Sequence, residues 1–202
     1  MIALAVCTLA ACSDQPTPVM PGELPGASAT AATAAGSGSD QSLLAAVRRA
    51  TAKYHDVDKA IADGYLSPVG GHCEESPEGG MGIHSANLAL VQDLAIDPEK
   101  PEVLLYLPTG GGNFRLIGVE YFQTLLLRNT ETGAVAPWFS PEPWPAHYQV
   151  VNAAPSVLGQ VFDGPMPGHN PGMPWHYDLH VWAWAPNPAG TFSMWNPSIS
   201  CP

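Results

Sequence analysis

The sequence predicts an α+β domain, with one N-terminal helix packed on a mainly antiparallel β-sheet or small open β-barrel. Three observations lead to this class. One stretch with helical spacing of apolar residues comes first. Several apolar or alternating runs follow it, and the 202 residues include 22 Pro and 20 Gly. Short strands joined by Gly- and Pro-rich turns form antiparallel sheets, and a leading helix can cover one face of such a sheet.

The N-terminus resembles a bacterial lipoprotein signal. Residues 2–11 are apolar and uncharged but too short to span a bilayer, which takes about 20 residues. They end in Leu9-Ala10-Ala11-Cys12, which resembles the lipobox, whose cysteine is lipidated. We therefore expect residues 1–12 to be a signal peptide ending at lipidated Cys12. No Lys or Arg precedes the apolar run, so the start codon lies further upstream or the signal is atypical; a plain signal peptide cut near Ala11 is the alternative.

The next segment is expected to be a flexible tether. Residues 13–40 mix Pro, Ala, Gly, Ser and Thr without apolar periodicity. A single α+β domain is then expected over residues 41–202. Together these features predict a protein of the cell envelope, held to the membrane by its lipid anchor, in the outer membrane or periplasm if the source is Gram-negative.

The charge balance limits the possible partners. Lys and Arg number 7 against 18 Asp and Glu, which gives a formal net charge of −11, and no Lys or Arg follows Arg128. Nucleic acid is excluded as a partner because phosphate binding needs clustered cations. A metal ion or a small molecule remains compatible with this charge. The sequence does not determine the oligomeric state.

The leading helix is predicted over residues 43–62. Polar residues fill the side opposite the apolar ones, and Asp40 can cap the start while Gly64 can end the helix. The apolar residues recur at near-helical spacing; they are Leu44, Val47, Tyr54, Val57 and Ile61.

The strands are predicted in the rest of the domain. Glycine pairs flank HCEESPE (residues 72–78), which is predicted to be a loop. Residues 102–107 and 114–122 are expected to pair through the hairpin loop TGGGN, which lacks the Lys-Ser/Thr of a phosphate loop. HYDLHVWAW (176–184) and TFSMW (191–195) complete the predicted strands.

Several blocks of the sequence are specific enough to resemble a known family. They cover most of residues 78–201 and read GMGIHSAN, PEVLLYLP, LIGVEYF, FDGPMPGHNPGMPWHYDLHVW, NPAGTFSMWNP and the terminal SC. The chain resembles an uncharacterised family of secreted bacterial proteins and lipoproteins that carries these blocks. The resemblance implies secretion but no activity, so the function has to come from the residues themselves.

The number and positions of the cysteines are consistent with a secreted protein. Cys7 lies in the signal and Cys12 would carry lipid, which leaves Cys73 and Cys201 as a pair in an oxidising compartment. We expect these two to form a disulfide. The alternative is that His72-Cys73-Glu74-Glu75 forms a metal cluster.

HYDLHVWAW has one unusual face. Side chains alternate along a strand, so one face carries two imidazoles, one carboxylate and two indoles without Lys, Ser or Thr. These residues are His176, Asp178, His180, Trp182 and Trp184. The other face has the composition of an ordinary core.

Two further residues extend this polar face into a possible metal site. On the predicted strand 114–122, strict alternation gives Glu120 apolar neighbours on either face, so its carboxylate needs a partner. Its own face carries Leu116, Gly118 and Phe122, and the other face carries Ile117, Val119 and Tyr121. His84 follows glycines that permit close backbone approach. We therefore predict that His84, Glu120, His176, Asp178 and His180 bind a divalent first-row metal, zinc first, with copper or another metal as the alternative.

Geometry limits how these residues can share one ion. Strand residues two apart have Cα atoms about 6.8 Å apart, so neighbours such as Asp178 and His180 can share a metal. His176 and His180 can share one only if the strand bends. The third of these strand residues would then hold a metal-binding side chain in its orientation without itself contacting the ion.

Other functions stay open. The His/Asp face can be a hydrogen-bonded network without metal, in a structural envelope protein. The face can also supply hydrogen bonds in a non-enzymatic binding module whose ligand groove is lined by tryptophans. These are Trp138, Trp144, Trp175, Trp182 and Trp184. Met166, His169 and Met173 would suit copper. No G-x-S-x-G motif supports serine hydrolysis; an enzyme built on the predicted metal would activate water or polarise a small oxygen-containing substrate.

Overall fold

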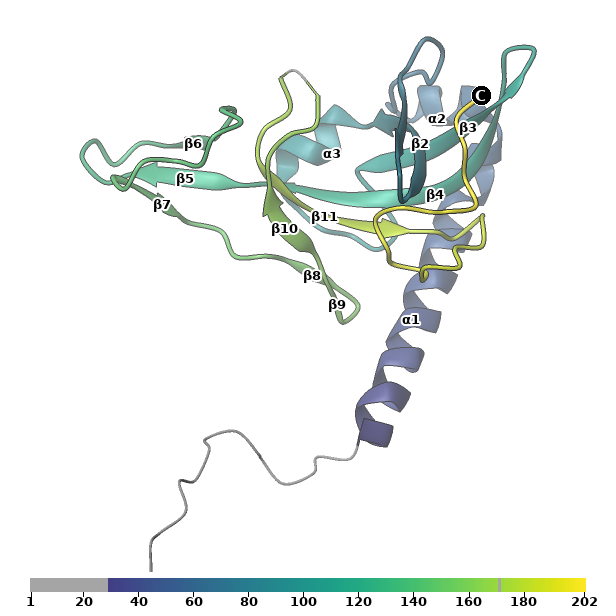
Figure 1. Ribbon diagram of the computed structural model, residues 1–202, viewed down its shortest axis with the longest axis horizontal. Coiled ribbons are helices and arrows are strands. Elements are labelled where there is room, and N and C mark those ends of the chain that lie inside the picture. The colour runs from purple at the N-terminus through teal and green to yellow at the C-terminus, as the bar shows by residue number, and fades with distance from the viewer. Residues whose placement is uncertain (1–28, 171) are drawn as a thin grey trace, which may run out of the picture.

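The computed structural model describes residues 29–170 and 172–202, with side chains from Gly38 onward. A long helix, α1 (Ala29–Thr51), leads into a curved antiparallel sheet, as Figure 1 shows. This confirms the predicted α+β class. The predicted signal, its Cys12 and residues 13–28 of the predicted tether lie outside the described residues.

The helical region ends at Ala62 as predicted, but it differs from the prediction at its start and in its middle. α1 begins at Ala29, inside the range predicted as tether, where the sequence is rich in alanine, the strongest helix former. It ends at Thr51, and a 3-10 turn, η1 (Ala52–His55), and a short helix, α2 (Val57–Ala62), follow in place of one continuous helix. The break lies at Asp56, whose backbone is extended and whose side chain accepts a hydrogen bond from the Asp58 N–H. An N-cap of this kind starts a new helix.

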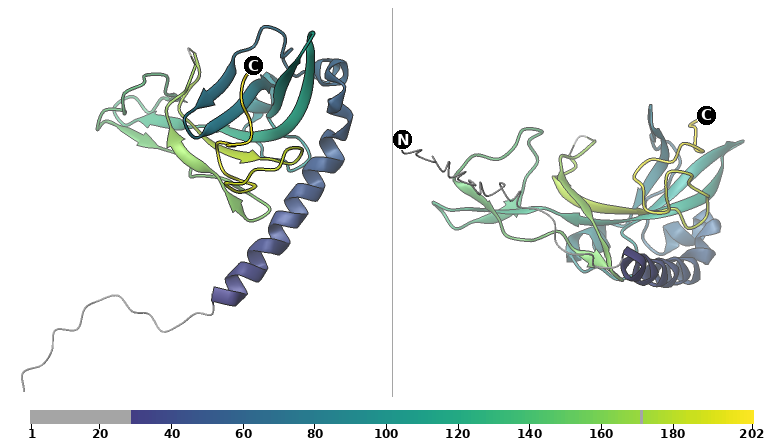
Figure 2. Two further views of the ribbon diagram at one scale, coloured as in Figure 1. Left: turned by 45° about the vertical axis from the view of Figure 1, so that its right-hand side comes forward. Right: turned by 60° about the horizontal axis from the view of Figure 1, so that its bottom comes forward.

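The main sheet has six strands, and each neighbouring pair is antiparallel. It bends into a half-barrel, which the two views of Figure 2 show. In spatial order the strands are β1 (Cys73–Ser76), β2 (Gly79–Ala86), β3 (Val103–Gly110), β4 (Asn113–Thr124), β11 (His176–Val181) and β10 (Asp163–Met166).

Smaller elements surround this sheet. The short helix α3 (Leu88–Asp93) connects β2 to β3. A three-stranded sheet extends away from the main one in Figure 1 and consists of β6 (Val135–Pro137), β5 (Leu126–Asn129) and β7 (Tyr148–Val150). The strands β8 (Ser156–Val157) and β9 (Gln160–Val161) form a hairpin.

Three predictions about the strands are wrong. The predicted loop HCEESPE contains β1, which pairs with β2. The strand at HYDLHVWAW ends at Val181, where the chain turns and the Ala183 N–H bonds the Val181 carbonyl. Residues 191–195 form no strand; the nearest ladder contact is an isolated bridge between Gly80 and Asn196.

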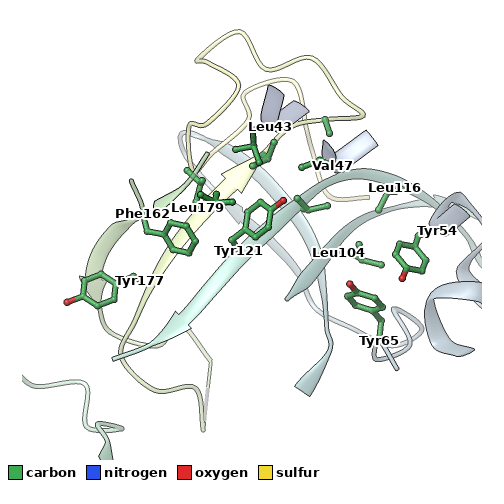
Figure 3. Packing of buried hydrophobic residues seen from close by; sticks show 14 of the residues in the cluster. Leu43, Val47, Tyr54, Tyr65, Leu104, Leu116, Tyr121, Phe162, Tyr177 and Leu179 are labelled. Atoms are coloured by element: carbon green, nitrogen blue, oxygen red, sulfur yellow. The ribbon is translucent and has the colours of Figure 1, made fainter. Parts of the chain in front are cut away.

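The sheet buries apolar side chains on both faces. On one face, Leu43 and Val47 of α1 pack with sheet residues such as Tyr121 and Leu179 (Figure 3). On the opposite face lies a second cluster that includes Ile199 from the C-terminal segment. Its other buried members are Val103, Leu105, Ile117, Phe122, Trp182 and Ala185. The chemically unusual residues lie on this second face.

A β-bulge changes the predicted faces of β4. Leu105 pairs with Gly118 but Tyr106 pairs with Leu116, so Ile117 is an extra residue in the ladder. Leu116 therefore packs on the helix face and Ile117 on the opposite one, the reverse of strict alternation.

No helix in the described ranges is both long enough and apolar enough to span a bilayer.

Candidate metal centre

Strand pairing brings most of the predicted ligands together. In β11, His176, Asp178 and His180 alternate onto the face that carries the second core cluster. The neighbouring strand β4 places Glu120 directly opposite His180. Directly opposed residues of antiparallel strands project to the same side of the sheet, so the carboxyl of Glu120 meets the polar side of β11.

His84 reaches the same place from β2. It pairs with Leu105, whose other partner is Gly118, a residue without a side chain. The predicted role of the glycines before His84 is confirmed at Gly82, which has a φ of 86° and lies so close to β3 that a Cβ there would be 2.7 Å from the Tyr106 carbonyl oxygen. The His84 Nε2 lies 3.4 Å from the Glu120 Oε2.

The donor atoms form two overlapping triads. One consists of His84, Glu120 and His180, the other of Glu120, His176 and Asp178, and the donor atoms of each lie within 4.8 Å of one another. The Asp178 Oδ2 lies 3.8 Å from both the His176 Nε2 and the His180 Nδ1. Two donors that bind one ion at about 2.1 Å lie no more than about 4.2 Å apart, so these pairs can share an ion after small movements.

The cluster is buried and lacks hydrogen-bond partners. Glu120, His176, Asp178 and His180 expose 2 % of their surface or less. Six of their side-chain atoms are buried without a hydrogen-bond partner: Glu120 Oε2, His176 Nε2, both Asp178 oxygens and both His180 nitrogens. Buried polar atoms are otherwise nearly always paired, and leaving one unpaired costs about 1–3 kcal/mol. In this arrangement these six atoms are not paired by hydrogen bonds with one another or with other described residues.

Burial also favours the neutral forms of the side chains. Desolvation lowers the pKa of His84 and of His176 to about 4, and lowers that of His180 well below its usual value. Desolvation raises the pKa of Asp178 to about 7 and that of Glu120 well above its usual range, with Asp178 adding to the effect on Glu120. Neutral imidazole is the form that binds a metal, and a cation would restore the ionised carboxylates.

One histidine is already oriented for binding. The His176 Nδ1 lies 3.0 Å from the Pro174 carbonyl oxygen, which can only accept a hydrogen bond. In the neutral ring the proton therefore lies on Nδ1, and the Nε2 lone pair is directed away from it. The ring also stacks on Phe122 at a centroid distance of 4.6 Å, which restrains its rotation.

A cavity of about 400 Å³ adjoins the cluster. His84, Glu120, Asp178 and His180 line it together with apolar side chains from β2, α3 and β3. The Asn170 Nδ2 donates to the Glu74 Oε1 at 3.1 Å, and both residues belong to its wall. The buried donors can therefore meet a small molecule.

The disulfide prediction is confirmed. Cys73 and Cys201 are bonded, with their Cα atoms 5.8 Å apart. The Cys73 sulfur is therefore not a thiolate ligand, and the alternative metal cluster around HCEE is wrong. The predicted copper set is only partly assembled, because His169 and Met173 line the cavity and Met166 does not.

The tryptophan prediction is wrong in its geometry. Trp184 turns to the helix face, where its Nε1 donates to the Thr51 Oγ1 of α1 at 3.0 Å. Trp182 packs in the second core cluster. Trp144 packs on Trp175, and the Trp138 ring on Tyr148. The cavity beside the donors is lined by none of them.

Sequence reasoning missed two features near the site. Glu102, the residue before β3, exposes 1 % of its surface and accepts a hydrogen bond from the Phe122 N–H. The wall contact between Glu74 and Asn170 joins residues 96 positions apart. An apolar run after Glu102 was a usable signal for its burial, whereas nothing local indicates the Glu74–Asn170 contact.

Comparison of the chain with protein-family models, curated proteins and solved structures found no match.

Proposed function

We propose that this protein binds a divalent transition metal, zinc first, through His84, Glu120, His176, Asp178 and His180. The observation that carries the proposal is the convergence of three imidazoles and two carboxyls in one buried place where six of their N and O atoms lack hydrogen-bond partners. Imidazole with carboxylate is a donor set for zinc and neighbouring first-row metals. Copper or another first-row ion is the alternative.

The metal site belongs, in this proposal, to a lipid-anchored protein of the bacterial cell envelope. The LAAC sequence ending at Cys12 supports the anchor. The disulfide supports a location in the cell envelope, because such bonds persist where the surroundings are oxidising. No cation-rich surface suited to nucleic acid is expected at a net charge of −11.

The cavity supports a role in ligand binding or catalysis over a purely structural one. A bound zinc ion would supply Lewis acidity toward water or an oxygen-containing molecule. A carboxyl or imidazole of the cluster that does not itself bind the ion would then be the proton-transfer group. The non-enzymatic alternative is an envelope binding module that uses the same cavity without a reaction.

The direct test is metal analysis of the untagged full-length chain after dialysis against zinc, copper, iron or manganese. The proposal predicts stoichiometric retention of at least one of these metals, zinc first. The double variant His84→Ala/His180→Ala should lose it, whereas the exposed His55→Gln, on η1, should not. Retention of none of the four metals would overturn the proposal, and equal retention by the double variant would place the metal elsewhere.

A further inference from the structure

The floor of the cavity is half apolar and half polar. Strand register places Ala86 opposite Val103, Val103 opposite Glu120, and Glu120 opposite His180, so these four residues form one row across β2, β3, β4 and β11. All four line the cavity. A molecule lying along this row therefore contacts methyl groups at one end and metal donors at the other.

The remaining walls extend the apolar half. Leu88 and Val91 of α3 lie on the lining, and so do Leu66 and Met173 from two loops. Leu66 and Leu88 each expose 51 % of their surface, although both are large aliphatic side chains. Exposed aliphatic residues beside a cavity of about 400 Å³ are what an entrance for an apolar molecule needs.

The charged side chains that line the cavity disfavour the binding of an anionic ligand. Among the described residues, its lining includes Glu74, Glu120 and Asp178 and no Lys or Arg. The carboxylates of Glu120 and Asp178 together neutralise one divalent ion. An anionic ligand would then place an uncompensated negative charge in a buried site, which carries a large desolvation cost.

Building on the proposed metal function, we propose that the site takes an uncharged small molecule with an aliphatic body and one oxygen donor, such as an alcohol, aldehyde or ketone. The oxygen lies toward Glu120 and His180 at the metal end. The aliphatic body lies along Val103 and leaves the cavity past Leu88.

The test uses two probes with the same chain length, 1-octanol and octanoate, titrated calorimetrically into the zinc-loaded full-length chain. We expect 1-octanol to bind at least about tenfold more tightly than octanoate, and 1-butanol to bind at least about tenfold more weakly than 1-octanol. Tighter binding of octanoate, or the same affinity for butanol and octanol, would overturn the inference.

Two surface variants locate the binding. Leu88→Asp puts a charge at the proposed entrance and should weaken 1-octanol binding at least about fivefold, with zinc uptake unchanged. The matched control Val161→Asp, on β9, changes a residue that is 65 % exposed and lies outside the cavity lining, so it should leave both affinities unchanged. Equal weakening by both variants would overturn the proposed location.

Failures of the two proposals are distinguishable. Normal zinc uptake without the 1-octanol preference overturns the ligand class alone. Absence of zinc, copper, iron and manganese uptake overturns the metal function and, with it, this inference.

Discussion

Asp178→Asn is the substitution that separates a metal ligand from a structural group. Asp178 is the residue whose carboxylate lies 3.8 Å from both His176 and His180, and both of its oxygens lack hydrogen-bond partners. Asparagine keeps the shape and removes the charge. Loss of a ligand or of its supporting partner typically weakens metal affinity 10- to 100-fold, so we expect zinc affinity to fall at least about tenfold, or about 1.4 kcal/mol.

The stability of the metal-free protein should change in the opposite direction. Burial raises the pKa of Asp178 to about 7 from the usual 3.8. Between these two pH values the unfolded chain loses the proton while the native protein keeps it, so the native state loses stability as the pH rises. The full difference is on the order of 4 kcal/mol above pH 7. Asparagine resembles the protonated carboxyl, so the metal-free variant should be at least as stable as wild type at pH 8.

Calorimetric zinc titration and urea unfolding at pH 8 measure the two effects, with His55→Gln as the control. Unchanged zinc affinity in Asp178→Asn would refute the assignment of Asp178 to the metal site. Unfolding of the metal-free variant would refute the electrostatic argument, because it would show that the ionised carboxylate holds the core together.

Three further outcomes follow from the structure, and one from the sequence. Zinc affinity should rise with pH at least up to about pH 7, the pKa to which burial raises Asp178, by up to about tenfold per unit for each proton displaced; titrations at pH 6, 7 and 8 check this, and a pH-independent affinity argues against carboxylate ligands. Glu102→Gln should stabilise the protein at pH 8 and leave zinc binding unchanged. Burial raises the pKa of Glu102 to about 8, so the wild-type native state loses stability as the pH rises above the usual 4.5, whereas glutamine stays neutral and still accepts the Phe122 N–H. Urea unfolding at pH 5 and 8 tests this, and lower stability of the variant at pH 8 contradicts it. Mass spectrometry should show the unreduced chain two hydrogens lighter than the reduced one, owing to Cys73–Cys201, and free thiols at Cys73 and Cys201 in the unreduced chain would disprove the bond. Cys12→Ser should release or stall the membrane-bound, lipid-labelled product, and equal membrane binding by wild type and variant would reject lipidation.

The sequence signals behind the fold class, which is confirmed, and behind the candidate site residues are local. Alternation along HYDLHV places His176, Asp178 and His180 on one face whatever the neighbouring strands are. Glu120 has apolar neighbours in the sequence, which indicated that its carboxyl needs a partner. The pairing that sets Glu120 against His180 is a long-range contact, and no sequence pattern fixes that register.

The errors have equally specific causes. Trp184 follows the polar residues in strict alternation, but the strand ends at Val181 and α1 offers the indole a hydrogen bond at Thr51. Ile117 changes face because a bulge inserts one residue into the ladder. HCEE looked like a loop because its strand is short and polar, and its position at the sheet edge next to β2 permits that composition.

X-ray absorption spectroscopy at the zinc edge of the zinc-loaded full-length chain tests the metal site most directly. The proposed site predicts a first shell of nitrogen and oxygen at about 2.0–2.2 Å, with the outer-shell scattering of at least two imidazoles and no sulfur at about 2.3 Å. It further predicts that Glu120→Gln changes this spectrum and His55→Gln does not. A sulfur shell, a spectrum without imidazole scattering, or one that Glu120→Gln leaves unchanged would contradict the account.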